Sequence, residues 1–377
     1  MKQYRCWAEI DLDALRENLA WIRHRVGPHV KIMTVVKADA YGHGLKQIAA
    51  LLMQSGTDVF GVANLTEAQS IRSVGSGWPI LMLGACLPFE VETAVRESVM
   101  ATISTRDEAV QFSAAASKLG RAAGLHLKID TGMGRLGVAP KHAAALWTDV
   151  AKLPNVLVRG LYTHFASAED DAAFSRSQKR QFARLLEKLP HSSLDYVHAN
   201  NSAALLFEEG THYNTVRPGL LVYGVLPSGT RRALSQLPRQ VRPALTWKCR
   251  VSLVKEVPRA TPLSYGRSFV APRAMRVATL TAGYGDGLLR AGSNRARVLI
   301  GGELCRVLGR ITMDQTLVDV SRLPDIQSGD EAVLIGRQGK SEITVNQLAE
   351  WCRTVPWEIL TAITARVPRV YRGGQAA

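Results

Sequence analysis

Short apolar runs alternate with segments of helical periodicity from the N-terminus to about Tyr223. Leu15, Leu19, Ile22 and Val26 show the spacing of one helix face. Thr105 and Glu108 predict a capping box for a helix that ends at Gly120. The runs expected to form buried strands are 31–36, 59–63, 79–83, 101–104, 125–129, 158–164, 194–198 and 215–223. Eight strand–helix units predict an α/β fold, a (β/α)8 barrel of the TIM type, although periodicity alone does not exclude an open doubly wound sheet.

The pattern changes after a basic, proline-dotted stretch from Pro227 to Pro243, which predicts a linker. Beyond it, short strands are expected at 247–257, 276–280, 296–300, 304–307, 315–320 and 331–335, and two helices at 345–351 and 356–364. We therefore expect two domains, a barrel over residues 1–240 and a mostly β domain over residues 241–377.

The composition is that of an ordinary globular protein, with 46% hydrophobic and 21% charged residues. No apolar run approaches the ~18 residues that a membrane span needs. The first residues contain neither an apolar segment nor a cleavage site, which predicts a cytoplasmic protein. Five scattered cysteines argue against both a disulfide framework and a zinc site, and we expect most of them to be buried thiols.

The chain is strongly basic, with 47 Lys and Arg against 32 Asp and Glu and a net charge of +15. Such a charge raises the question of nucleic-acid binding. The basic residues are spread along the chain, however, and no aromatic–basic motif accompanies them. An anionic ligand, such as a phosphate-bearing cofactor, accounts for the charge more simply.

In a barrel, reactive groups lie at the C-terminal ends of the strands. Lys37 follows the first apolar strand, where burial would lower its pKa and make the amine nucleophilic, although a lone lysine at this position is more often a surface residue. Loops after the seventh and eighth strands often hold a phosphate, and here they supply Ser202 and the backbone of Gly219 and Leu220. A nucleophilic lysine that faces a phosphate pocket suggests pyridoxal phosphate (PLP), and a lysine-dependent aldolase fits equally well at this point.

Seven motifs in order along the chain resemble those of the alanine racemase family. They are 35–44, 128–137, 216–224, 263–267, 283–287, 313–315 and 366–369, and together they span nearly the whole sequence. The resemblance implies a PLP-binding barrel, a C-terminal β domain and a homodimer with active sites shared between subunits. It also implies interconversion of L- and D-alanine, which would supply D-alanine for peptidoglycan.

By this resemblance, Lys37 binds PLP and acts as a base on one face of the substrate, while Tyr265 of the partner subunit acts on the other. Two proton carriers on opposite faces of one carbon are what racemisation requires. His164 would stack on the cofactor ring and Arg217 would face its pyridine nitrogen. Because a guanidinium cannot give up its proton, Arg217 should weaken the electron sink and suppress side reactions.

The resemblance assigns the remaining site residues to the ligand's anionic groups. Tyr41, Ser202, Gly219 and Leu220 would hold the cofactor phosphate. Arg135 would bind the substrate carboxylate and the phenolic oxygen of PLP, and the backbone amide of Met313 would meet the same carboxylate. Lys128 would lie close to Arg135, and carbamylation of Lys128 is expected because it converts a repelling cation into an anion.

One position departs from the family pattern. Trp357 stands where the family usually has a tyrosine whose hydroxyl reaches the cofactor phosphate, and an indole can only donate. A broader amino-acid or serine racemase therefore remains the alternative to an alanine racemase. A PLP barrel decarboxylase is disfavoured by Arg217, and a non-catalytic PLP carrier by Tyr265 and the β domain.

Overall fold

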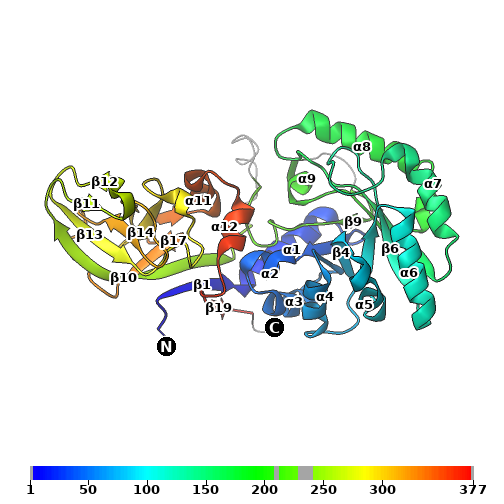
Figure 1. Ribbon diagram of the computed structural model, residues 1–377, viewed down its shortest axis with the longest axis horizontal. Coiled ribbons are helices and arrows are strands. Elements are labelled where there is room, and N and C mark those ends of the chain that lie inside the picture. Colours follow the sequence, from blue (N-terminus) through cyan, green and yellow to red (C-terminus); the bar gives the residue numbers. More distant parts are fainter. Residues whose placement is uncertain (1–2, 208–211, 228–240, 375–377) are drawn as a thin grey trace.

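The computed structural model describes residues 3–207, 212–227 and 241–374, and it has two parts that lie side by side (Figure 1). The first part is a closed barrel of eight parallel strands in chain order. They are β2 (Lys31–Val35), β3 (Val59–Val62), β4 (Ile80–Ala85), β5 (Met100–Ile103), β6 (Ala123–Lys128), β7 (Val156–Tyr162), β8 (Tyr196–His198) and β9 (Thr215–Val216). Pairing of β9 with β2 closes the barrel, so the predicted barrel is confirmed and the open sheet is excluded.

Helices surround these strands and bury their apolar faces against them. They are α1 (Leu12–Val26), α3 (Leu45–Met53), α4 (Leu65–Arg72), α5 (Val91–Arg96), α6 (Arg106–Leu119), α7 (Pro140–Ala151), α8 (Ala172–Leu186) and α9 (Ser202–Phe207). The predicted capping box of α6 is confirmed: the Glu108 amide donates to Thr105 Oγ1, and Glu108 accepts from the Thr105 amide. Gly120 ends this helix in the left-handed conformation.

The interior of the barrel is filled at the N-terminal ends of its strands. Met33, Val59, Leu81, Met100 and Tyr196 form one buried cluster there. This end of the barrel is therefore a packed core, and a ligand is expected at the opposite end, towards the C-terminal ends of the strands.

The second part is built around one long strand, β10 (Leu245–Val257), which pairs with β1, β13 and β17. Its other strands are β1 (Cys6–Asp11), β13 (Met275–Leu280), β14 (Arg297–Ile300), β15 (Glu303–Arg306), β16 (Thr316–Asp319), β17 (Glu331–Gln338), β18 (Ser341–Ile343), β19 (Arg369–Arg372) and the hairpin β11 (Pro262–Leu263) and β12 (Phe269–Val270). The helices α11 (Val345–Cys352) and α12 (Pro356–Ala362) follow late in the chain, and α12 contacts the barrel at α2 (Lys37–Gly42), the short segment after β2. The mostly β character predicted for this part is confirmed.

One expected strand is wrong, and one strand was not expected. The strand expected at 215–223 is wrong beyond Val216, because residues 219–224 form turns in which the Val222 amide donates to Gly219. The N-terminal strand β1 was not expected, and it joins the sheet of the second part rather than the barrel, pairing with β10 and β19. Most of the expected linker lies outside the described residues.

All five cysteines are free thiols, and four of them are buried. Within the described ranges, no helix has the length and apolarity to cross a bilayer.

Candidate active site

A cavity of about 400 Å³ opens at the C-terminal ends of the barrel strands. Ten of the residues singled out from the sequence line it: Lys37, Tyr41, Lys128, Arg135, His164, Ser202, Arg217, Gly219, Leu220 and Trp357. Trp357 comes from α12 of the second part, and the others come from the barrel. The fold thus brings together side chains that are up to 320 positions apart in the sequence.

Lys37 begins a turn with an unusual backbone. Residues 38–41 have φ between 51° and 55°, so they form one turn of left-handed helix although none of them is glycine. The left-handed conformation costs an L-residue roughly 1–2 kcal/mol, so this turn must be held by contacts around it. Because of this turn, the residues at its two ends, Lys37 and Tyr41, both reach the cavity.

Carboxylates and a histidine hold the turn from the barrel side. Glu67 of α4 accepts from the amides of Ala38 and Ala63, both at 2.7 Å, and so ties the turn to the end of β3. Asp39 Oδ1 accepts from the Leu45 amide at 2.7 Å, at the start of α3. His43 Nδ1 donates to the carbonyls of Ala40 and Tyr41, at 3.0 and 2.9 Å.

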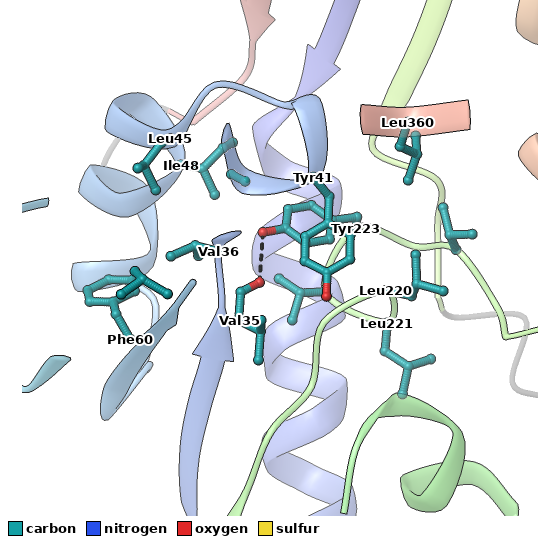
Figure 2. Close-up of a cluster of buried hydrophobic side chains, with 14 of the residues drawn as sticks. Val35, Val36, Tyr41, Leu45, Ile48, Phe60, Leu220, Leu221, Tyr223 and Leu360 are labelled. Atoms are coloured by element: carbon teal, nitrogen blue, oxygen red, sulfur yellow. Dashed lines mark hydrogen bonds between the residues drawn. The ribbon is translucent and has the colours of Figure 1, made fainter. Parts of the chain in front are cut away.

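The second part of the molecule holds the same turn from the other side. Arg369 Nε donates to the Gly42 carbonyl at 2.9 Å. A Cβ at Gly42 would lie 2.3 Å from the Leu360 carbonyl of α12, so only glycine allows this approach. Figure 2 shows the buried side chains around this turn, where the Tyr223 hydroxyl donates to the Val35 carbonyl at 3.1 Å and the rings of Tyr223 and Tyr41 lie 5.0 Å apart.

The amine of Lys37 is prepared for nucleophilic chemistry. Burial lowers its pKa from the ordinary value, and the positive charge of Arg135 lowers it further. A larger fraction of the amine is therefore unprotonated near neutral pH than in an exposed lysine.

Backbone amides and hydroxyls form an anion-binding corner at the β8 and β9 ends. Ser202 Oγ accepts from the Gly219 amide at 2.9 Å and from the Leu221 amide at 3.3 Å. A Cβ at Gly219 would lie 2.6 Å from the Tyr41 hydroxyl, so any side chain there would fill the corner. Burial raises the pKa of Tyr41, whose hydroxyl therefore stays a neutral donor, and the Trp357 side chain opposes that shift.

Arg217 is buried among neutral acceptors. Its Nη2 donates to the carbonyls of Thr163 and Ala199, both at 2.9 Å, and to His164 Nδ1 at 3.2 Å. Its Nη1 donates to His198 Nδ1 at 2.7 Å. Burial lowers the pKa of Arg217 to about 10, which leaves the guanidinium charged at neutral pH. Burial and the charge of Arg217 lower the pKa of His164 far enough to keep its ring neutral.

Lys128 is a second amine in the cavity, and it is buried more deeply than Lys37. It is the last residue of β6 and is only 2% exposed. Burial lowers its pKa to about 8, with further contributions from Arg135 and Arg217. Asp130 does not form an ion pair with it in the described structure, and its carboxylate accepts from the amides of residues 132–134 instead.

Two of the predicted site residues do not line this cavity. Tyr265 lies at the start of a short 3-10 turn, Tyr265–Arg267, and is 71% exposed, while Met313 is 53% exposed. Both belong to the second part of the chain. The nearby Tyr284 is also exposed, at 42%.

The cavity also contains residues that the sequence analysis missed. They include Tyr162, Leu83, Leu136, Glu169 and Asn201. Tyr162 had a usable signal, because it stands two residues before His164 at the end of an apolar run. Glu169 lies in a loop without any pattern that marks it.

The residues present fit pyridoxal phosphate. The cofactor needs an amine for its aldehyde, donors for its phosphate and a partner for its ring nitrogen. Lys37, the Ser202–Gly219 corner and Arg217 supply these three in one cavity. The cavity is lined by four cationic side chains and one carboxylate, that of Glu169, and this excess of positive charge also favours an anionic ligand.

Comparison with known proteins decides the family. The profile of the alanine racemase N-terminal domain matches residues 10–227, and that of the alanine racemase C-terminal domain matches residues 244–371. The chain belongs to the alanine racemase family. It is similar to the alanine racemase of Halothermothrix orenii, with 39% identity over 369 residues that cover 97% of this chain and 96% of that protein.

Solved structures of the family have the same fold. An alanine racemase of Clostridium difficile 630 superposes with a TM-score of 0.90 at 33% identity, covering 99% of this chain and 97% of that one. The biosynthetic alanine racemase of Pseudomonas aeruginosa gives a TM-score of 0.89 at 32% identity, covering 98% of this chain and 100% of that one.

Proposed function

We propose that this protein is an alanine racemase that uses PLP to interconvert L- and D-alanine. The observation that carries the proposal is one cavity containing a half-buried lysine amine, an anion-binding corner and an arginine in place of an acidic partner for the ring nitrogen. The family of the chain supports the same conclusion.

Lys37 would hold the cofactor through its amine, and Ser202, Tyr41 and the amides near Gly219 would bind the phosphate. When bound, PLP supplies an electron-withdrawing ring that acidifies the Cα hydrogen of an attached amino acid. Arg217 keeps its own proton, so it would donate a hydrogen bond to the ring nitrogen without protonating it. This arrangement would weaken the electron sink and so favour return of the proton to Cα over amino-group transfer.

Racemisation needs a proton carrier on each face of Cα, and we propose that two copies of the chain supply them. Lys37 carries the proton on one face, and Tyr265 of the partner subunit carries it on the other. The exposure of Tyr265 and Met313, and their absence from the cavity of their own chain, support a site completed by a second copy. The Met313 amide and Arg135 would then orient the substrate carboxylate.

The side-chain pocket favours a small substrate. Trp357 lines the cavity together with Leu83 and Tyr162, and an indole leaves less room than the phenol that the family usually has there. Alanine is therefore the expected substrate, and a broader racemase that also accepts serine is the alternative. We further propose that the product serves peptidoglycan synthesis in the cytoplasm.

The test is racemisation in deuterated water. The purified protein with PLP is incubated with L-alanine, and chiral chromatography with mass detection follows D-alanine and deuterium at Cα. We expect D-alanine to form with one deuterium, and Lys37→Ala to abolish both signals. Serine and lysine should react far more slowly than alanine. Comparable rates for all three would overturn the narrow substrate assignment, and no racemisation of any amino acid would overturn the proposed function.

A further inference from the structure

Two buried histidines lie inside the barrel next to Arg217, and neither lines the cavity. His126 is on β6, two residues before Lys128, and His198 is the last residue of β8. His198 stacks on the Tyr162 ring, with centroids 4.5 Å apart and planes at 15°. The His126 ring stacks less closely on Tyr196, below it in the barrel. Both imidazoles are thus held in fixed orientations.

The three side chains form one line of hydrogen bonds. Arg217 Nη1 lies 2.7 Å from His198 Nδ1, and His198 Nε2 lies 3.1 Å from His126 Nδ1. The line ends at His126 Nε2, which is buried and has no partner among the described residues.

Chemistry fixes the direction of every bond in this line. A guanidinium can only donate, so His198 Nδ1 must accept and its proton must be on Nε2. That Nε2–H then donates to His126, so His126 Nδ1 accepts and its proton is also on Nε2. Burial lowers the pKa of His126 to about 3 and that of His198 well below its ordinary value, so neither ring carries a second proton at neutral pH.

Packing alone does not explain a histidine at position 126. Its ring requires glycine on the neighbouring strand, because a Cβ at Gly160 would lie 2.4 Å from His126 Nδ1. The register of β6 with β7 shifts at the same place. An apolar side chain would fill this space without leaving a buried nitrogen unpaired. What an apolar side chain cannot supply is an acceptor for His198 Nε2–H.

That acceptor stabilises the neutral form of His198 that Arg217 requires, because it gives the Nε2–H a partner. With the proton on Nε2, His198 presents a lone pair to Arg217. With the proton on Nδ1, an N–H group would point at the guanidinium N–H group, and one of the two side chains would have to move. We propose that His126 is a positioning residue that stabilises the Nε2–H tautomer of His198 and, through it, holds the Arg217 guanidinium in place at the cavity.

The tautomers can be measured directly in the cofactor-free protein. The ring nitrogens of ¹⁵N-histidine-labelled protein are observed by solid-state NMR, with assignment by single substitution. We expect His126 and His198 to be neutral with protonated Nε2. In His126→Leu the acceptor is gone, and we expect His198 to populate both tautomers. In His126→Asn the amide oxygen can accept in the place of Nδ1, and the single tautomer should return.

A second readout follows the consequence for the cofactor and rests on the proposed function. If Arg217 is less well held, more of the turnovers should end in amino-group transfer, in which alanine is oxidised to pyruvate and the cofactor is converted to its amine form. We expect the ratio of pyruvate formed to alanine racemised to rise about fivefold or more in His126→Leu, and to fall back in His126→Asn. Thr57→Val, which removes the buried 2.6 Å contact with Thr34 elsewhere in the barrel wall, is the control for general loosening and should leave the ratio unchanged.

The two readouts separate the two claims. A wild-type His198 with its proton on Nδ1, or a His198 that keeps one tautomer and an unchanged pyruvate ratio in His126→Leu, overturns the role of His126 even in an active racemase. A protein that shows the expected tautomers but no racemisation overturns the proposed function and leaves the hydrogen-bond line standing. A rise in the ratio in Thr57→Val as large as that in His126→Leu also counts against the positioning role.

Discussion

Lys128 is expected to react with carbon dioxide. The structure indicates how far burial increases the neutral, reactive fraction of its amine. With a pKa of about 8, roughly 9% of this amine is neutral at pH 7. A lysine with the reference pKa of ~10.4 has about 0.04% of its amine neutral at the same pH. The neutral amine is the form that attacks carbon dioxide, so burial beside Arg135 and Arg217 raises its concentration about 200-fold.

Carbamylation also reverses the local charge. The product is an anion, so repulsion between Lys128 and Arg135 becomes attraction, which favours the modified state once it has formed. At a fixed concentration of dissolved carbon dioxide, modification should become faster as the pH rises from 6 to 8. It should then level off above the pKa, because the amine is already mostly neutral there.

The assay is ¹³C NMR of protein equilibrated with ¹³C-labelled carbon dioxide. We expect one carbamate signal that is lost in Lys128→Ala and retained in Lys118→Ala, which removes an exposed lysine. Lys37→Ala should also retain it, which would exclude the other lysine amine of the cavity as the source of the signal. A bare ammonium at Lys128 in well-resolved electron density, or a labelled signal that survives Lys128→Ala, would refute this reasoning.

Three further substitutions test other parts of the site and the fold. Glu67→Ala removes two charge-assisted bonds, one from the left-handed turn at Ala38 and one from the end of β3 at Ala63. We therefore expect about 2–4 kcal/mol lower stability by urea unfolding and weaker PLP binding by fluorescence, and unchanged PLP affinity would contradict the role given to the turn. Trp357→Tyr should enlarge the pocket and raise kcat/KM for L-serine relative to L-alanine, and an equal or lower ratio would show that the indole does not limit substrate size. Thr105→Ala should cost about 1 kcal/mol of stability through loss of the α6 cap, with kcat unchanged, and a stability equal to that of the wild type would argue against the cap.

The barrel could be predicted because its strands are buried on both faces and therefore appear as apolar runs. The same property caused the error at 215–223. Leu220, Leu221 and Val222 are buried in turns rather than in a strand, and an apolar run does not distinguish the two. The strand β1 escaped notice because its partners in β10 and β19 lie more than 230 positions away, and no local pattern reveals such pairing.

The candidate site was predicted largely through motifs. The features of the site that were not predicted depend on tertiary contacts. The left-handed turn at residues 38–41 could not be foreseen, because non-glycine residues avoid that conformation unless tertiary contacts impose it. His126 could not be singled out either, because its partner His198 is 72 positions away and only the closed barrel brings the rings together. The exposure of Tyr265 in one chain likewise appears only in the folded structure.

The shared active site is tested most directly by mixing two inactive variants. Lys37→Ala and Tyr265→Ala are each purified, unfolded together, refolded with PLP and assayed for conversion of L- to D-alanine. In a mixed dimer, one of the two sites has both Lys37 and Tyr265 of the partner subunit. Random assembly makes half of the dimers mixed, so about one quarter of wild-type activity should appear. Activity that stays at the sum of the two separate variants, while refolded wild type recovers fully, would contradict a site built from two copies.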